Sequence, residues 1–308
     1  MKSKILKLLI DNGINYNDQH KDYIEIPEKN VRIYSIDDAY KYRYPYIQDE
    51  IGGIKDKKFF QTTSIDNEKN GIRTIWIKPW EFTDDSRQKN VISSIILAAC
   101  GKIKNVFNGR DCEVREITTK ELRQFLEKNS FYGFRGAALS LGLFLKKDIS
   151  EEHPKGTLLM VYTFGFPYFG AKKKKYDLEI IRAATLINCQ IRGGASKLFK
   201  NFTNNYNSVQ VGGKEVIWNK ICYYVDYDHN NGNSLTHLGF DFEGYAGAGF
   251  MNVYKETGIH FHRKPLLHKQ IMEQIRNGEV FSVFNAGVKV FTYTKNVEVK
   301  DDSDFINE

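Results

Sequence analysis

Cysteine is scarce in this chain, and the few cysteines present follow no ligand pattern. The 308 residues include only four cysteines: Cys100, Cys112, Cys189 and Cys222. No two of them have the spacing of a C-x-x-C pair. Their scatter favours a reducing compartment and argues against a structural zinc site. The N-terminus has no signal-like pattern, and the apolar runs at residues 91–100 and 137–145 are shorter than the ~20 residues that span a bilayer. We therefore expect a cytoplasmic protein.

Acidic residues are outnumbered by basic ones. The sequence has 45 Lys and Arg against 38 Asp and Glu, which gives a formal charge of +7 near neutral pH. This excess suits a polyanionic partner, because cationic side chains displace the counterions that are condensed on phosphates. At ~100–200 residues per domain the length predicts two domains. Disorder is expected only in the acidic tail, residues 301–308.

Residues 1–112 carry the pattern of a small α/β domain. A helical stretch at residues 5–9 ends at Asn12-Gly13, a pair that favours a helix C-cap. Two alternating strands at residues 23–26 and 31–34 flank a Pro-Glu-Lys-Asn turn. The pattern then predicts a helix, a buried strand and a second helix, at residues 57–68, 72–77 and 90–103.

Residues 113–300 predict a second domain of mixed α/β (α+β) class. Thr118 and Glu121 have the spacing of a capping box, which begins a helix at residues 120–128 after a strand at residues 112–117. Further strands are expected at residues 138–145, 157–164 and 221–226. Further helices are expected at residues 176–188, 193–202, 232–238 and 267–277.

Five blocks of this second domain carry a family resemblance. They are YDLEIIR at 176–182, GGASKLFK at 193–200, YVD at 224–226, NGN at 231–233 and LGF at 238–240. In this order and spacing the chain resembles the C-terminal domain of phage homing endonucleases whose nuclease part is similar to very-short-patch repair enzymes. The stretch IHFHR at 259–263 fits the same family. The resemblance implies a double-stranded DNA partner, the cytoplasm of a host cell, and a DNA contact by Arg263.

The second domain is also similar to the acetyltransferase (GNAT) fold, and one of its turns has a phosphate-binding pattern. Between a strand and a helix stand Arg192, Gly193, Gly194, Ala195, Ser196 and Lys197. Backbone N–H groups at a helix N-terminus carry partial positive charge, and glycines let a phosphate approach closely. This loop could hold the pyrophosphate of acetyl-CoA or a DNA phosphate, and an ordinary loop without a ligand is the alternative.

A polar run follows the strand that ends at Asp226. It includes His229, Asn231 and Asn233. A carboxylate beside a histidine can act as a general base, and the asparagine amides can order DNA bases and phosphates. In the structural alternative, Asp226 caps the next helix and Asn231-Gly232 forms a turn.

Two stretches combine aromatic and basic residues. Residues 131–136 place Arg135 among Phe, Tyr and Gly, and the aromatic residues 166–170 precede a run of four lysines: Lys172, Lys173, Lys174 and Lys175. Aromatic rings stack on bases and cations neutralise phosphates, so both stretches are candidate DNA contacts on one edge of the protein. A solvated loop tip is the alternative for the lysines.

The nuclease part departs from the family pattern. The resemblance implies carboxylates on the first two strands that share Mg²⁺, but those positions hold Tyr23 and Tyr34, and Phe60 stands where a histidine is expected. Four nearby carboxylates are candidates to substitute: Asp22, Glu25, Asp37 and Asp38. A one-residue shift turns a strand side chain to the opposite face, however. We therefore interpret Asp22 and Glu25 as surface carboxylates.

The main hypothesis is thus a DNA-binding protein that resembles phage homing endonucleases and has lost nuclease chemistry. The alternative is a GNAT-like transferase that modifies a nucleobase or another amine. It would hold acetyl-CoA at residues 192–197, and Asp226 or His229 would handle a proton. A metal-dependent endonuclease with a shifted site at Asp22 and Glu25 is the third hypothesis.

Overall fold

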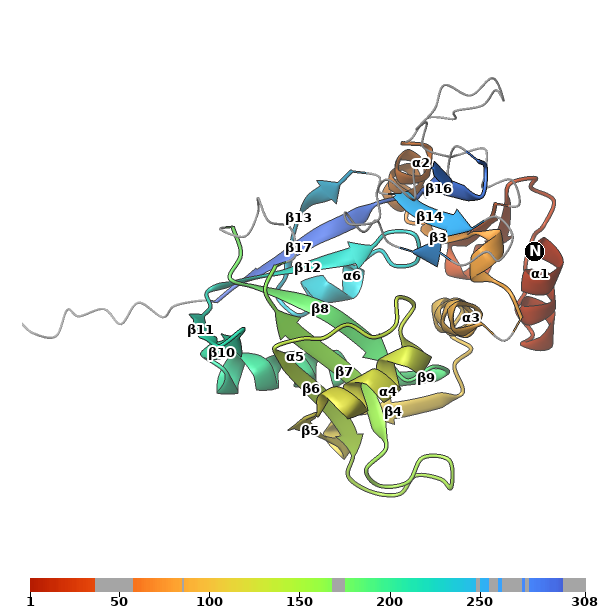
Figure 1. The fold of residues 1–308 in the computed structure, drawn as a ribbon. Coiled ribbons are helices and arrows are strands. Elements are labelled where there is room, and N and C mark those ends of the chain that lie inside the picture. The colour runs from red at the N-terminus through yellow and green to blue at the C-terminus, as the bar shows by residue number, and fades with distance from the viewer. Residues whose placement is uncertain are drawn as a thin grey trace, which may run out of the picture.

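The protein has a mixed α/β fold, as predicted. A computed structural model describes residues 1–36, 58–84, 86–167, 175–247, 250–254, 260–261, 273–274 and 277–295. A seven-stranded sheet lies at the centre of the molecule, and the N-terminal helices and strands lie at one end of it (Figure 1). No helix within these ranges is long and apolar enough to cross a membrane.

Within the described residues, the N-terminal part has one small sheet, three α-helices and two short 3-10 helices. In chain order its elements are α1 (Lys2–Asp11), β1 (Tyr23–Ile26), η1 (Pro27–Lys29), β2 (Val31–Ser35), α2 (Phe59–Lys69), β3 (Arg73–Ile77), η3 (Pro79–Glu81) and α3 (Arg87–Ala99). The sheet order is β1-β2-β3, with an antiparallel β1-β2 hairpin and a parallel β2-β3 pair. The predicted hairpin is confirmed. Pro27 starts its turn and Asn30, at a φ of 51°, ends it.

The seven-stranded sheet has the order β13-β17-β12-β8-β7-β6-β5. In chain order its strands are β5 (Cys112–Glu116), β6 (Leu139–Leu145), β7 (Leu158–Gly165), β8 (Leu178–Thr185), β12 (Lys220–Asp226), β13 (Asp241–Ala246) and β17 (Val288–Thr294). Helix α4 (Thr119–Asn129) covers one face, where Val161 and Leu126 share a hydrophobic cluster. Helix α5 (Gly194–Asn205) covers the other face, where Tyr162 clusters with Phe202.

Shorter elements surround this sheet. They are β4 (Asn105–Asn108), η4 (Gly109–Asp111), β9 (Cys189–Arg192), β10 (Ser208–Val211), β11 (Lys214–Ile217), α6 (Asn233–Thr236), β14 (Phe250–Tyr254), β15 (His260–Phe261) and β16 (Val280–Phe284). Strands β4 and β9 form a parallel pair, β10 and β11 form a hairpin, and β15-β14-β16 form a second three-stranded sheet.

Helix α4 begins where the sequence predicts. Thr118 Oγ1 accepts a hydrogen bond from the Glu121 amide (3.3 Å), and Glu121 Oε2 accepts one from the Thr118 amide (2.8 Å). Each side chain thus satisfies an amide that the helix itself leaves without a partner. The capping box is confirmed.

The predicted helix at residues 176–188 is wrong, because this segment contains strand β8. It pairs with β7 along its length and with β12 at its start, and its first four residues are all buried. A strand covered on both faces has no apolar-polar alternation, so its pattern does not separate it from a buried helix. The hairpin β10-β11 is also absent from the sequence prediction. Of the predicted helix at residues 267–277, only residues 273, 274 and 277 lie within the described ranges.

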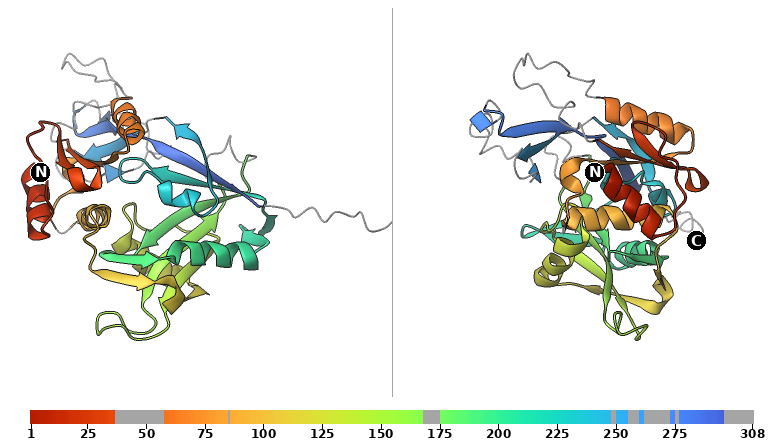
Figure 2. Two further views of the ribbon diagram at one scale, coloured as in Figure 1. Left: turned by 180° about the vertical axis from the view of Figure 1, so that it is seen from behind. Right: turned by 90° about the vertical axis from the view of Figure 1, so that its right-hand side faces the viewer.

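One hydrophobic cluster joins the two ends of the chain. It includes Tyr34, Phe60 and Trp76 from the N-terminal part, and Val253 and Val283 from β14 and β16. The Trp76 side chain is fully buried within this cluster. The red and orange N-terminal elements accordingly lie beside the blue C-terminal strands in both views of Figure 2.

Candidate functional site

The parallel strands β8 and β12 separate soon after they begin. They pair over three positions, Ile221 with Leu178, Cys222 with Glu179 and Tyr223 with Ile180, and the pairing stops there. The carboxyl ends of separating parallel strands are where ligands bind in open α/β sheets. The segment between α4 and β6 reaches this place, because the Tyr132 hydroxyl donates to Asp226 Oδ2 at 2.8 Å.

Asp226 and His229 meet at the end of β12. His229 Nδ1 lies 3.0 Å from Asp226 Oδ2, and the Asp228 amide donates to Asp226 Oδ1 at 3.0 Å. The Phe131 ring packs on the imidazole with 4.5 Å between ring centroids. The two residues proposed for proton handling are therefore brought together. Both oxygens of Asp226 already accept hydrogen bonds, however, and its side chain is only 19% exposed.

Three further charged residues join this pair and form a buried ionic cluster. The ammonium of Lys78 lies 2.6 Å from Asp228 Oδ2 and 3.4 Å from Glu81 Oε1, and Lys78 and Glu81 are fully buried. Glu81 Oε2 lies 3.9 Å from His229 Nε2. Sequence reasoning missed Lys78 and Glu81. The available signal was a lysine placed directly after the apolar run Ile75-Trp76-Ile77.

Mutual attraction favours the charged forms of Lys78, Glu81, Asp226 and His229 despite their burial. Burial by itself lowers the pKa of His229, but the charge and hydrogen bond of Asp226 outweigh it and raise that pKa to about 10. Burial raises the pKa of Asp226, and His229 more than reverses this and brings it to about 2. Burial and the nearby Asp226 charge raise the pKa of Tyr132, which keeps its proton. Burial raises the pKa of Asp228, against the attraction of Lys78. With Lys78 and His229 beside the carboxyl groups of Asp226, Asp228 and Glu81, the cluster offers no net positive charge to an anion.

The loop predicted to hold a phosphate enters α5 as a glycine turn. Gly193 has a φ of 71° and is exposed. Within the described residues, no hydrogen bond reaches the amides of Gly194, Ala195 or Ser196. The backbone of Gly109 packs against this turn, since a Cβ on Gly109 would lie 3.0 Å from the Gly193 carbonyl.

The remaining two residues of this loop point away from a common ligand. Lys197 Nζ donates to the carbonyls of Gly109 (3.0 Å) and Cys112. The Lys197 charge is thus directed at the β4-η4 segment, while Arg192 is exposed at the end of β9. The segment from β4 to η4 therefore covers one side of the turn.

The residues proposed for nuclease chemistry do not gather around a metal position. Tyr23 and Tyr34 are register partners, with ring centroids 5.2 Å apart. Glu25 Oε1 accepts a hydrogen bond from Arg32 at 3.0 Å, and Asp22 is exposed. In the part of the chain that the structure describes, no group of three His, Cys, Asp or Glu side chains could hold a metal ion. Residues 37 and 38 lie outside that part.

The proposed DNA contacts have different surroundings. Lys175 forms an ion pair with Glu243. Asn231 Oδ1 accepts a hydrogen bond from the Asn233 amide (3.3 Å), and Gly232 between them has a φ of 74°, as the turn interpretation requires. The exposed side chain of Asn233 remains accessible to a partner. Lys172, Lys173, Lys174 and Arg263 lie outside the described residues.

Four arginines have their guanidinium groups within or beside residues 131–136: Arg87, Arg123, Arg135 and Arg182. We call these four residues the arginine strip. Arg123 stacks over the Phe134 ring at 3.9 Å, and Arg182 lies 5.7 Å from the Tyr132 ring. Arg87 packs against Gly133 and pairs with Glu127 at 2.6 Å. Burial and then the charge of Arg135 lower the pKa of Arg182.

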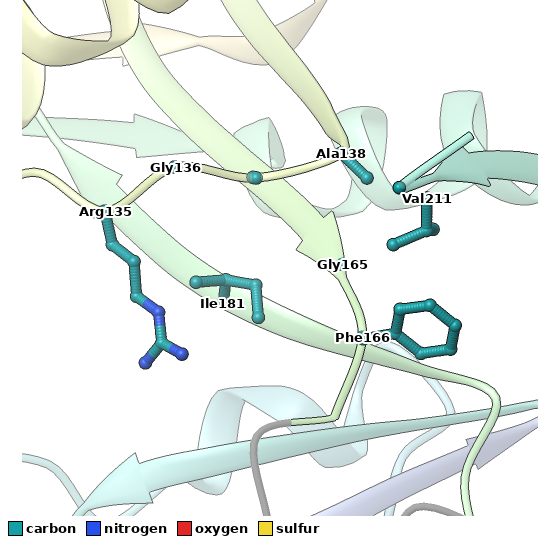
Figure 3. Close-up of a pocket in the computed structure, with 9 residues that line it drawn as sticks. Arg135, Gly136, Ala138, Gly165, Phe166, Ile181 and Val211 are labelled. Atoms are coloured by element: carbon teal, nitrogen blue, oxygen red, sulfur yellow. The ribbon is translucent and has the colours of Figure 1, made fainter. Parts of the chain in front are cut away.

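A depression of about 360 Å³ adjoins the strip (Figure 3). Its lining includes Arg135, the backbone at Gly136, the β8 side chain Ile181, and Val211 from the β10-β11 hairpin. Phe166, at 47% exposure, contributes a ring to the same surface. Arg135 and Phe166 thus line one depression, while residues 168–170 of the aromatic stretch lie outside the described residues.

Comparison with solved structures finds four chains that match this protein. No protein-family model matches the chain, and no curated protein matches it. Among solved structures, Arabidopsis thaliana NAA60 in complex with acetyl-CoA matches with a TM-score of 0.33 and 14% sequence identity, over 60% of this chain and 99% of that one.

The ionic cluster and the arginine strip differ in charge and in exposure. In the ionic cluster the Asp226 and Lys78 side chains are engaged within the protein, whereas His229 Nε2 is buried without a hydrogen bond to any described residue, and the cluster carries no net positive charge. The arginine strip carries positive charge beside partly exposed aromatic rings and an open depression. The strip is therefore the better place for an anionic ligand.

Proposed function

We propose that this protein binds double-stranded DNA through the arginine strip. The observation that carries the proposal is that arginines gather at residues 131–136: Arg123 stacks over the Phe134 ring at 3.9 Å, Arg182 lies 5.7 Å from the Tyr132 ring, and Arg135 lines the adjoining depression. Two cations held close together cost free energy, and a phosphate placed between them removes that cost. Arginine suits this role because it keeps its charge and can donate two parallel hydrogen bonds to one phosphate.

The rest of the surface agrees with an anionic partner. The chain carries a formal charge of +7. Arg123 is exposed on α4, and its stacking on Phe134 holds the guanidinium over the strip. The resemblance to phage homing endonucleases implies the same partner. Contacts of this kind are made to the backbone of DNA and confer little sequence preference.

Changing Arg135 to Gln is expected to weaken binding to duplex DNA of any sequence. Loss of one phosphate contact should flatten the slope of log K against log salt by about 1. Fluorescence anisotropy with a labelled duplex over a salt series measures both effects. The matched control is Lys155→Gln, an exposed cation in the turn at the far end of β6. Equal slopes for wild type and Arg135→Gln would contradict the proposal.

The separation of β8 and β12 favours a second candidate, a transferase that uses acetyl-CoA. The turn at Gly193 begins α5, and within the described residues the amides of Gly194, Ala195 and Ser196 receive no hydrogen bond. A pyrophosphate is a suitable ligand for such amides. Because Gly109 packs on the turn, residues 105–111 would have to move for the cofactor to bind along it. Asp226 would then be the group nearest to the strand ends for handling a proton.

Titration calorimetry with acetyl-CoA tests this second candidate. A transferase of this type should give heat at up to millimolar cofactor, and Ser196→Asp should remove it, because a carboxylate at the start of α5 repels the pyrophosphate. Gln88→Asp places the same charge in the first turn of α3 and should leave the heat unchanged. Absence of heat with the unmodified protein would exclude acetyl-CoA as its cofactor.

A further inference from the structure

We infer that the depression beside the arginine strip receives a single unstacked base of a DNA strand. This inference rests on the proposed DNA binding and adds the form of DNA that the protein prefers. The volume of about 360 Å³ lies at the lower end of the ~300–1,000 Å³ range of small-molecule sites. Such a depression admits one flat ring, whereas a fully stacked duplex presents only its grooves and its backbone.

The wall opposite Arg135 suits the face of a base. Phe166 is a large aromatic residue that is 47% exposed, and Ile181 and Val211 are apolar neighbours in the same lining (Figure 3). An exposed aromatic ring stacks on any base, because every base has a π-face. Apolar neighbours favour the stacked arrangement, because they remove the ring from water.

The floor suits the edge of a base. Gly136 and Ala137 belong to no helix or strand, and within the described residues no hydrogen bond engages their backbone groups. Gly136 also has open space where a side chain would stand. Amide and carbonyl groups on an accessible backbone can pair with the polar edge of a base without selecting its identity.

The charge at the rim identifies the ligand as a nucleotide unit. Arg135 lines the depression, and none of the described lining residues is acidic. An aromatic side chain of a protein partner would fill the apolar part but bring no anion to the cation at Arg135. A base attached to its phosphate satisfies both parts.

Binding to three DNA forms tests the inference. The probes are a 12-nucleotide single strand, the perfect duplex of that sequence, and the duplex with one central mismatch. The single strand and the mismatched duplex should bind more tightly than the perfect duplex, since their bases unstack at lower cost. Phe166→Leu, which loses the flat ring, should weaken both preferred forms about tenfold and leave the perfect duplex within about twofold.

Two comparison variants make the result specific. Phe242→Leu removes an aromatic ring of similar exposure (44%) from β13, which is an edge strand of the seven-stranded sheet. This change should alter none of the three affinities. Ala138→Leu places extra side-chain volume in the depression and should reproduce the loss seen with Phe166→Leu.

Each outcome separates this inference from the proposed function. Equal affinities for the three forms, unchanged in Phe166→Leu, overturn the base site. If binding nevertheless weakens steeply with salt, the proposed DNA binding stands without it. Lack of binding to every form at low salt overturns both. Loss of the preference for unstacked DNA in Phe166→Leu, together with salt-dependent duplex binding, supports both.

Discussion

Replacing Lys78 with methionine is expected to lower the free energy of unfolding by about 3–5 kcal/mol, because it leaves buried carboxylates without their cation. The ammonium lies 2.6 Å from Asp228 Oδ2 and 3.4 Å from Glu81 Oε1, and the lysine has no solvent exposure. Methionine retains most of the side-chain volume, so the lost charge dominates the change. Urea unfolding monitored by tryptophan fluorescence measures the loss.

A surface pair with the same geometry provides the control. Lys89 Nζ lies 2.6 Å from Asp84 Oδ1, but Asp84 is 63% exposed. Lys89→Met is therefore expected to lower the free energy of unfolding far less than Lys78→Met does. The double variant Lys78→Met, Asp228→Asn should lose less than the sum of its single changes, because one unpaired charge is removed as well. A loss below ~1 kcal/mol in Lys78→Met would contradict the role assigned to this pair.

The buried cluster connects segments that are distant in the sequence. Lys78 and Glu81 follow β3, whereas Asp228 follows β12. The Trp76 amide donates to the Asp228 carbonyl (2.8 Å), and Asp228 Oδ1 accepts from the Ala286 amide (2.8 Å). The carboxylate thus holds three segments together. A rigid junction of this kind keeps the N-terminal part in a fixed position against the seven-stranded sheet.

Local sequence signals predicted the elements that depend on local chemistry. The β1-β2 hairpin follows from Pro27 and Asn30 at its turn, and the start of α4 follows from the Thr118 and Glu121 capping box. The contact between Asp226 and His229 could also be predicted from the sequence, because the chain after a strand can fold back within three residues. In these cases the interacting groups are close neighbours in the sequence.

Other features depend on contacts that no local pattern contains. Strand β8 was predicted as a helix because its burial on both faces comes from α5 and from strands elsewhere in the chain. The apolar run before Lys78 is a signal of its burial, but no local pattern identifies its partner Asp228, which is 150 positions away. The cover over the Gly193 turn likewise comes from Gly109, on a separate segment. Tertiary contacts decide all three.

Changing His229 to glutamine is expected to flatten the dependence of stability on pH above neutrality. Contacts with Asp226 and Glu81 raise the pKa of His229 to about 10, from an ordinary value of 6.5. Between these values the folded protein binds one proton more than the unfolded chain. The stability due to His229 is therefore complete below about pH 6.5 and is lost as pH rises toward 10. The free energy of unfolding should fall by at most about 1.4 kcal/mol per pH unit across this range.

Between pH 7 and 8.5, the change in stability that is due to His229 can be measured apart from that of the cysteines. Burial raises the pKa of Cys189 to about 11 and that of Cys222 to about 12, so these thiols add to the slope only above their unfolded value of about 8.5. Urea unfolding at half-unit steps should show the decline in wild type and in the control His237→Gln, which changes an exposed histidine. In His229→Gln the decline should nearly vanish. A slope in this variant equal to that of wild type would show that His229 does not hold the extra proton, and that the Asp226 carboxylate is neutralised from elsewhere.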